Sequence, residues 1–249
     1  MQEAIHSSKA RRDKGMIIKI DMANDFDRVK HSFLYMVLKK FGFSRKFINL
    51  VHVCIGNSWI APLINGRPSK FFQASRGLRK RFPLSPFLYI FLAESLSRKL
   101  PAERNDGTLS GIRTVQGFRP MNRSLFANDS LFLGGASLLI PKNFKDILQN
   151  YCKVFGGLVN YNKSSIYGWN IDQNAISRIT NILGMQGFDK WEKFKYLGLP
   201  ISSGSSKGNH WNEVVSKIQA KIKFWGGRWL NPARKLVLIN YVLTALPIY

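Results

Sequence analysis

Two acidic segments that lie far apart in the sequence constrain the fold of this chain more than any other feature. The first is an apolar, β-branched run at residues 16–20 that ends in Asp21. The second, residues 126–130, lies between two apolar runs and has Asn128 and Asp129 at its centre, which predicts a tight β-hairpin. If the two strands pair in one sheet, Asp21 and Asp129 become neighbours.

Carboxylate oxygens gathered in this way are the hard ligands that Mg²⁺ prefers. Metal ions that contact both the attacking and the leaving oxygen are the basis of nucleotidyl transfer. Asn128 places a neutral amide where a second ligating carboxylate is expected. The sequence therefore predicts a metal site of the nucleotidyl-transfer kind that lacks part of its negative charge.

The charge of the chain indicates a polyanionic partner. Lys and Arg total 38 against 14 Asp and Glu, a formal net charge of +24. The basic residues are dispersed, which favours a long nucleic-acid cleft over a short targeting signal. The alternative is a basic but inert surface. Apolar residues make up 45% of the chain, enough for a core.

The N-terminus has early charges and lacks the apolar segment of a secretory signal. The longest apolar run, residues 87–93, is too short to span a bilayer. We therefore expect a protein of the nucleus or cytoplasm that is neither secreted nor membrane-bound. The sequence does not indicate an oligomeric state.

Hydrophobic periodicity predicts strands and helices in alternation, followed by a helical C-terminal part, which is typical of an α+β fold. The Asn65-Gly66 pair predicts a hairpin, and Ser44 predicts a helix N-cap. A short extended piece is expected at 194–200. Strands are expected at 16–20 and 164–169, and helices at 32–40, from 44 onward, 84–100, 143–155, 173–183, 212–224 and 234–245.

Five short motifs, in order, resemble those of the reverse transcriptase of plant LINE-type (non-LTR) retrotransposons, over a region from about Glu3 to the last residue. Each motif alone is weak, but their order and spacing are specific. They are Lys19-Ile20-Asp21-Met22 with Phe26-Asp27-Arg28-Val29 (motif A), Ser75-Arg76-Gly77-Leu78-Arg79 with Pro83-Leu84-Ser85-Pro86 (motif B), Phe126-Ala127-Asn128-Asp129 (motif C), Asn162-Lys163-Ser164 (motif D) and Lys195-Tyr196-Leu197-Gly198-Leu199-Pro200 (motif E).

The resemblance implies a right-hand polymerase palm, with an antiparallel sheet and packed helices, partial fingers and a helical thumb at the C-terminus. It implies that residues 1–190 form the palm with residual fingers elements, and that 191–249 form the primer-grip region and thumb-like helices. It also implies RNA-directed DNA synthesis with two Mg²⁺ ions, an RNA template and a DNA primer.

The resemblance further implies roles for single residues, each with a structural alternative. Asp129 could simply hold the hairpin turn, Phe26 could be a core residue, and Lys163 could be a surface lysine. The implied catalytic residues are Asp21, Asn128, Asp129 and Lys163, with Asp21 and Asp129 as metal ligands. The implied nucleotide-binding residues are Phe26, Arg76, Gly77 and Arg79, and the implied primer-grip residues are Tyr196, Leu197 and Gly198.

Three segments, six residues in all, depart from the family pattern. Asn128 replaces the first aspartate of the Asp-Asp pair, Lys80-Arg81-Phe82 replaces Gln-Gly-Asp, and Asn24-Asp25 replaces Lys-Ala. We therefore expect a truncated and degenerate copy whose activity is lost or severely impaired. The alternative function is that of a non-catalytic remnant that binds nucleic acid nonspecifically through its basic surface.

Overall fold

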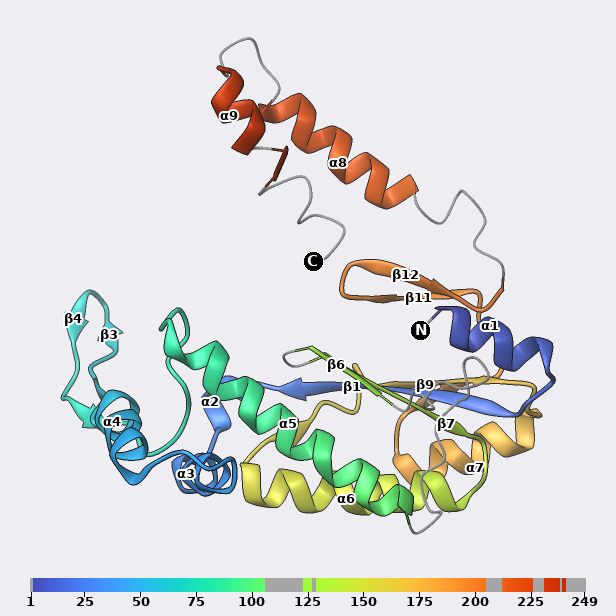
Figure 1. Ribbon diagram of the computed structural model, residues 1–249, viewed down its shortest axis with the longest axis horizontal. Coiled ribbons are helices and arrows are strands. Elements are labelled where there is room, and N and C mark those ends of the chain that lie inside the picture. The colour runs from blue at the N-terminus through green and yellow to red at the C-terminus, as the bar shows by residue number, and fades with distance from the viewer. Residues whose placement is uncertain are drawn as a thin grey trace.

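A computed structural model describes residues 2–105, 123–126, 129–204, 212–225, 231–237 and 239–240 (Figure 1). Its centre is a six-stranded sheet formed by β1 Gly15–Ala23, β6 Arg123–Phe126, β7 Asp129–Gly135, β8 Leu158–Val159, β9 Ser165–Trp169 and β10 Gln186–Phe188. The main order is β10-β9-β1-β7-β6, and β8 pairs with the end of β1. All pairs are antiparallel except β9 with β10.

Strand β1 lies inside the sheet because its side chains are apolar on both faces. Ile18 and Ile20 point toward one buried cluster, and Ile17 points toward the other. Asp21 follows the same alternation, so it lies on the Ile17 face near the end of the strand.

Four helices cover the Ile18 face and form the larger core with it (Figure 1). Two glycines with positive φ, Gly156 and Gly184, end two of these helices, as a left-handed C-cap requires. The four helices are α3 His31–Lys40, α5 Leu84–Asn105, α6 Leu139–Phe155 and α7 Gln173–Leu183.

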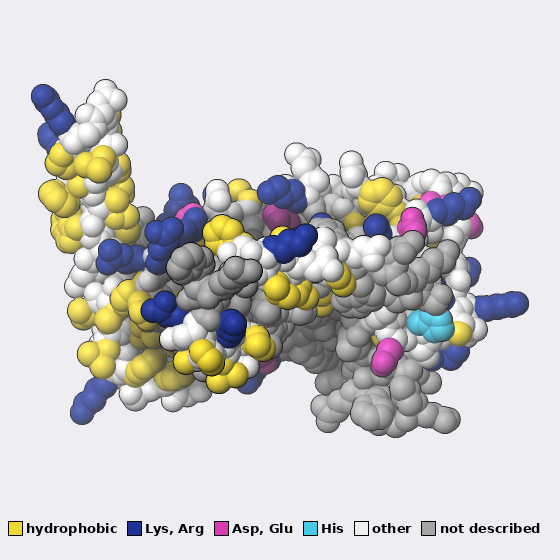
Figure 2. Space-filling model, turned by 90° about the horizontal axis from the view of Figure 1, so that it is seen from above, with side chains coloured by type: hydrophobic (Ala, Val, Ile, Leu, Met, Phe, Trp, Pro, Cys, Tyr) yellow, Lys and Arg dark blue, Asp and Glu magenta, His cyan; other side chains and the backbone are white. Residues whose placement is uncertain are grey.

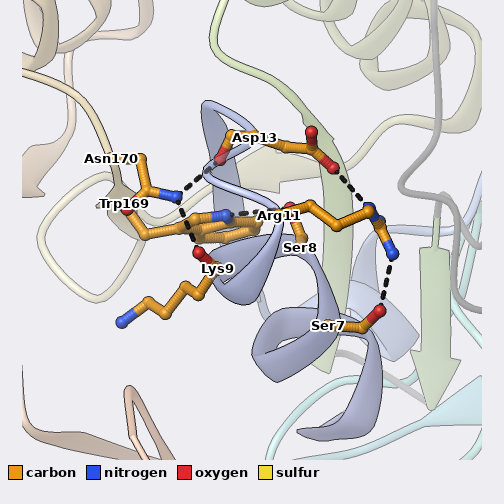
Figure 3. Close-up of polar contacts among 7 residues, drawn as sticks. All are labelled: Ser7, Ser8, Lys9, Arg11, Asp13, Trp169 and Asn170. Atoms are coloured by element: carbon orange, nitrogen blue, oxygen red, sulfur yellow. Dashed lines mark hydrogen bonds and ion pairs between the residues drawn. The ribbon is translucent and has the colours of Figure 1, made fainter.

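The other face of the sheet is covered by α1 Gln2–Ala10 and by a hairpin of β11 Lys193–Tyr196 and β12 Leu199–Ser202. Trp169 anchors α1, because its indole Nε1 donates a hydrogen bond to Ser8 Oγ at 3.1 Å (Figure 3). Next to it, Asn170 Nδ2 donates to the Asp13 carbonyl oxygen at 2.9 Å. These contacts hold the N-terminal segment against the end of β9, which lies between β1 and the edge strand β10.

An arm projects from the helical layer on the left of Figure 1. We use the name "arm" for residues 45–73, which comprise α4 Arg45–Gly56, four two-residue strands and the segments between them. The strands are β2 Trp59–Ile60, β3 Leu63–Ile64, β4 Arg67–Pro68 and β5 Phe72–Gln73. Asn65 and Gly66 connect β3 to β4 with φ of 51° and 77°, the pattern of a type I′ turn. The predicted hairpin is therefore confirmed, as is the Ser44 N-cap, which accepts a hydrogen bond from Phe47 N.

The expected α+β class, with an antiparallel sheet and packed helices, is confirmed. The single extended piece expected at 194–200 is wrong, because the chain folds back at Leu197 and Gly198 to pair β11 with β12. Helix α1 was not expected at all.

The C-terminal helices are α8 Asn212–Trp225 and α9 Pro232–Val237. No helix in the described ranges is both long and apolar enough to cross a membrane.

Candidate active site

The antiparallel pairing of β1 with β7 places Asp21 directly opposite Asp129. Residues opposite one another point to the same face of a sheet, and their Cβ atoms are typically about 4.5–5.5 Å apart. Both side chains are half-buried, so they remain accessible to a metal ion or a substrate. The neighbourhood that the sequence predicted for these two aspartates is confirmed.

The backbone of Asp21 is held by the segment that carries the motif D residues. Ser164 Oγ accepts a hydrogen bond from Asp21 N at 3.1 Å, and Asn160 N donates to the Asp21 carbonyl oxygen at 2.9 Å. Ser164 is fully buried, while the preceding Lys163 is exposed in the turn. The structure therefore brings the Lys163 backbone close to Asp21, and its catalytic role stays a prediction.

Tyr196 connects the β11–β12 hairpin to the motif C strands. Its hydroxyl donates to the Ser124 carbonyl oxygen at 3.1 Å and lies 3.5 Å from the Asp129 carbonyl oxygen. Burial raises the pKa of Tyr196, and the nearby Asp129 carboxylate adds to this. Leu197 and Gly198 form the hairpin turn, with φ of 51° and 76°. Of the three residues assigned to the primer grip, Tyr196 thus reaches the backbone beside Asp129, while Leu197 and Gly198 make the turn that follows it.

Phe26 lies in the short helix α2 Asp25–Arg28, just after β1. Its ring stacks on Tyr89 of α5, with centroids 4.7 Å apart and planes within 10°. Its carbonyl oxygen accepts a hydrogen bond from Leu78 N at 2.7 Å, which joins motif A to motif B. The stacking on Tyr89 covers one face of the Phe26 ring. It fits both predicted roles of Phe26, the sugar contact and the core residue.

Gly77 sits where motif B crosses motif A. Its φ is +94°, and a Cβ at this position would lie 2.9 Å from the Asp27 carbonyl oxygen, so any larger residue would push the two segments apart. Arg76 and Arg79, on either side, are exposed. No described contact joins either arginine to the aspartate pair, so their predicted role in nucleotide binding rests on the resemblance.

Asp25 is a functional candidate that we did not predict as a site residue. It is 6% exposed, and its Oδ1 accepts a hydrogen bond from Phe26 N at 2.9 Å. The Tyr89 hydroxyl interacts with the carboxylate, yet Oδ2 has no hydrogen bond of good geometry among the described residues. Burial raises the pKa of Asp25, and the charge of Asp21 raises it further. The only signal in the sequence was the carboxylate at a position where the family usually has alanine.

The residues that replace Gln-Gly-Asp change both charge and backbone. Lys80 Nζ lies 2.8 Å from Asp27 Oδ2, in an ion pair exposed to solvent. Arg81 adopts φ of +64°, a left-handed conformation that glycine adopts without strain but a residue with a Cβ does not. Arginine is therefore poorly suited to the backbone conformation at this position.

The donor set fits Mg²⁺ in part. Asp21 and Asp129 offer carboxylate oxygens on one face of the sheet, which is the chemistry that Mg²⁺ prefers. Within the described ranges, no group of three or more His, Cys, Asp or Glu residues could hold a metal ion. Asn128 lies outside the described residues. Asp21 and Asp129 are thus the residues that would hold the ion.

Comparisons with known proteins agree with this geometry. Residues 1–201 match the family described as reverse transcriptase (RNA-dependent DNA polymerase). The chain is 24% identical over 242 residues to a retrovirus-related Pol polyprotein from the type-2 retrotransposable element R2DM of Drosophila melanogaster, covering 91% of this chain and 21% of that protein. It is 25% identical over 245 residues to the Pol polyprotein from a type-1 retrotransposable element R2 of Popillia japonica, covering 95% and 33%.

A shorter match, 41% identical over 68 residues, joins the chain to an uncharacterized mitochondrial protein of Arabidopsis thaliana, covering 27% of this chain and 56% of that protein. The chain spans a third or less of the length of the two Pol polyproteins.

Among solved structures, the chain is similar to telomerase from Candida tropicalis in complex with a TWJ fragment of telomeric RNA. The TM-score is 0.54 with 15% identity, covering 84% of this chain and 33% of that chain. For telomerase from Candida albicans the TM-score is 0.52 with 13% identity, covering 80% and 31%. At this identity the likeness concerns the fold, and it confirms the polymerase palm. Because the family match includes both strands of the aspartate pair, the chain belongs to the reverse transcriptase (RNA-dependent DNA polymerase) family.

Proposed function

We propose that this chain is the reverse transcriptase domain of a non-LTR retrotransposon of the plant LINE type, and that its nucleotidyl-transfer activity is severely impaired. The observation that carries the proposal is the register that sets Asp21 opposite Asp129. Two aspartates that lie opposite one another on paired strands repel each other, and a cation bound between them offsets this repulsion.

In this proposal Asp21 and Asp129 bind Mg²⁺, which supplies positive charge to the phosphoryl oxygens during nucleotide addition. Ser164 and Asn160 keep the Asp21 backbone in place through their hydrogen bonds. Phe26, supported by Tyr89, forms the wall where a ribose 2′-hydroxyl would lie. Lys163 would give a proton to the pyrophosphate leaving group. The template would be RNA and the primer DNA, as in the family.

Two differences support impairment. The neutral Asn128 cannot offset the charge of two divalent ions, and loss of one such preorganised group typically costs about 3–4 kcal/mol, roughly a hundredfold or more in rate. Lys80 and Arg81 add two positive charges and a strained backbone next to motif A. Both changes lie at the proposed nucleotide site, whereas the β1–β7 pairing and the hydrogen bonds between motifs A and B are intact.

Primer extension tests the proposal. Purified protein receives oligo(dT) on poly(rA), dTTP and either Mg²⁺ or Mn²⁺. We expect little or no extension from the natural chain and a gain of at least a hundredfold when Asn128→Asp is combined with Lys80→Gln, Arg81→Gly and Phe82→Asp. Adding Asp21→Ala to the restored chain should abolish this gain. Rapid extension by the natural chain that depends on Asp21 would overturn the claim of impairment.

The second candidate function is a non-catalytic remnant that binds nucleic acid nonspecifically. The +24 net charge and the Lys80–Asp27 ion pair favour it. It predicts that the restored chain gains no activity, while binding persists and its log affinity falls linearly with log salt. An affinity that does not change with salt concentration would exclude a binding surface that contacts the phosphate backbone.

A further inference from the structure

The arm lies in a long part of the sequence that contains no acidic residue. Between Asp27 and Glu94 there are twelve Lys or Arg residues and no Asp or Glu. Arg67 and Lys70 of the arm are exposed and, among the described residues, have no ion-pair partner. A surface of one sign that is not neutralised within the protein favours a polyanionic ligand.

The arm also exposes aromatic rings. Trp59 is 61% exposed, Phe71 is 69% exposed and Phe72 is 51% exposed. Within the described part of the chain, no ring pair includes any of the three, and at least half of the surface of each residue is exposed. Figure 2 shows apolar and basic side chains together on the projecting arm at the left.

The arrangement of the strands spreads these rings over the arm. In the β2–β5 ladder Trp59 lies opposite Gln73, and Ile60 lies opposite Phe72, so Trp59 and Phe72 point to opposite faces. In the adjoining β3–β4 hairpin, Arg67 lies opposite Ile64. Each face of the β2–β5 ladder thus presents a ring, and Arg67 lies in the adjoining hairpin, where it can contact the phosphates of a flexible strand.

Two other occupants of an exposed apolar arm are less suited to it. A second copy of this chain carries the same +24 charge, so like charges would oppose the contact. Double-stranded nucleic acid has phosphates, but its bases are stacked within the helix and cannot cover the rings. Unpaired RNA or DNA offers both a phosphate chain and open base faces, which aromatic and basic residues bind together.

We propose that the arm is a binding surface for single-stranded nucleic acid, in which Trp59, Phe71 and Phe72 stack on bases and Arg67 and Lys70 contact phosphates. The surface is separate from the Asp21–Asp129 pair, since the arm lies beyond α2 and α3 from the sheet (Figure 1). The proposal extends the proposed function by naming an unpaired strand as a ligand of the arm, but it requires no nucleotide addition.

Fluorescence anisotropy with a labelled 15-nucleotide oligo(U), and with a blunt RNA duplex of equal length, tests this surface in the absence of dNTP. We expect tighter binding of the single strand. Trp59→Ala should weaken that binding by roughly 5- to 150-fold, the effect of one lost stacking interaction, and Trp59→Phe should retain most of it. Arg67→Ala should make the salt slope shallower by about 0.7.

Leu63→Ala is the matched control, because Leu63 lies on the same arm and is 72% exposed. We expect it to change single-strand binding less than twofold. If Leu63→Ala is as damaging as Trp59→Ala, the arm is a general apolar docking surface and the proposal is wrong. Equal binding of single strand and duplex, or no effect of Trp59→Ala, would also overturn it. The binding assay contains no dNTP, so a failure of the catalytic proposal would be seen separately in primer extension.

Discussion

Replacing Asp25 by asparagine should stabilise the protein, and the gain should depend on pH. Asp25 is nearly fully buried, one of its oxygens lacks a hydrogen bond of good geometry among the described residues, and the negative charge of Asp21 acts on it. Asparagine has almost the same shape and carries no charge. The substitution therefore removes the electrostatic cost and keeps the packing against Tyr89.

The size of the effect follows from the state of that carboxylate. A buried polar group without its partner costs about 1–3 kcal/mol, and more when it is charged. Because the pKa of Asp25 in the folded protein is raised above its ordinary value of 3.8, the folded state holds the proton more tightly than the unfolded state. The free energy of unfolding contributed by this residue therefore falls as pH rises from the unfolded pKa through the folded pKa, by up to about 1.4 kcal/mol per pH unit.

Urea unfolding followed by circular dichroism at several pH values from 3.5 to 8, with EDTA present, measures this contribution. We expect Asp25→Asn to be close to the natural chain in stability at the lowest pH, and more stable by about 1–3 kcal/mol at pH 8. Asp146→Asn is the control, because Asp146 is exposed on α6, and it should change stability by less than about 0.5 kcal/mol. A loss of stability in Asp25→Asn at pH 8, or a difference independent of pH, would refute the reasoning.

Three further substitutions test contacts of the palm sheet and of motif B, each by urea unfolding. Arg81→Gly should stabilise the chain by about 1 kcal/mol, because glycine adopts the φ of +64° without the strain of a Cβ; a loss of stability would show that the arginine side chain makes compensating contacts. Gly15→Ala should destabilise it by about 1–3 kcal/mol, because a Cβ would lie 2.2 Å from Trp169 Cζ2; an unchanged midpoint would mean that the indole can move aside. Tyr196→Phe should cost about 0.5–1.5 kcal/mol through loss of the hydrogen bond to Ser124; no cost would indicate that the hairpin is held by apolar packing alone.

Local features of this protein were determined by the sequence itself. The Asn65-Gly66 turn and the Ser44 N-cap depend on neighbouring residues alone, and both have the expected geometry. The apolar, β-branched run at residues 16–20 also predicted β1 and the position of Asp21 near its end. These signals are reliable because the backbone preferences and hydrogen bonds that they describe involve residues only a few positions apart.

Contacts between distant segments were decided by the tertiary structure. The register between β1 and β7 could be proposed from two acidic segments, but only the packed sheet sets Asp21 opposite Asp129. The burial of Asp25 against α5 has no local signal, and Gly198 alone does not show that the chain folds back there to pair β11 with β12. Whether a carboxylate is solvated or buried depends on which helix packs over it, and that depends on the whole core.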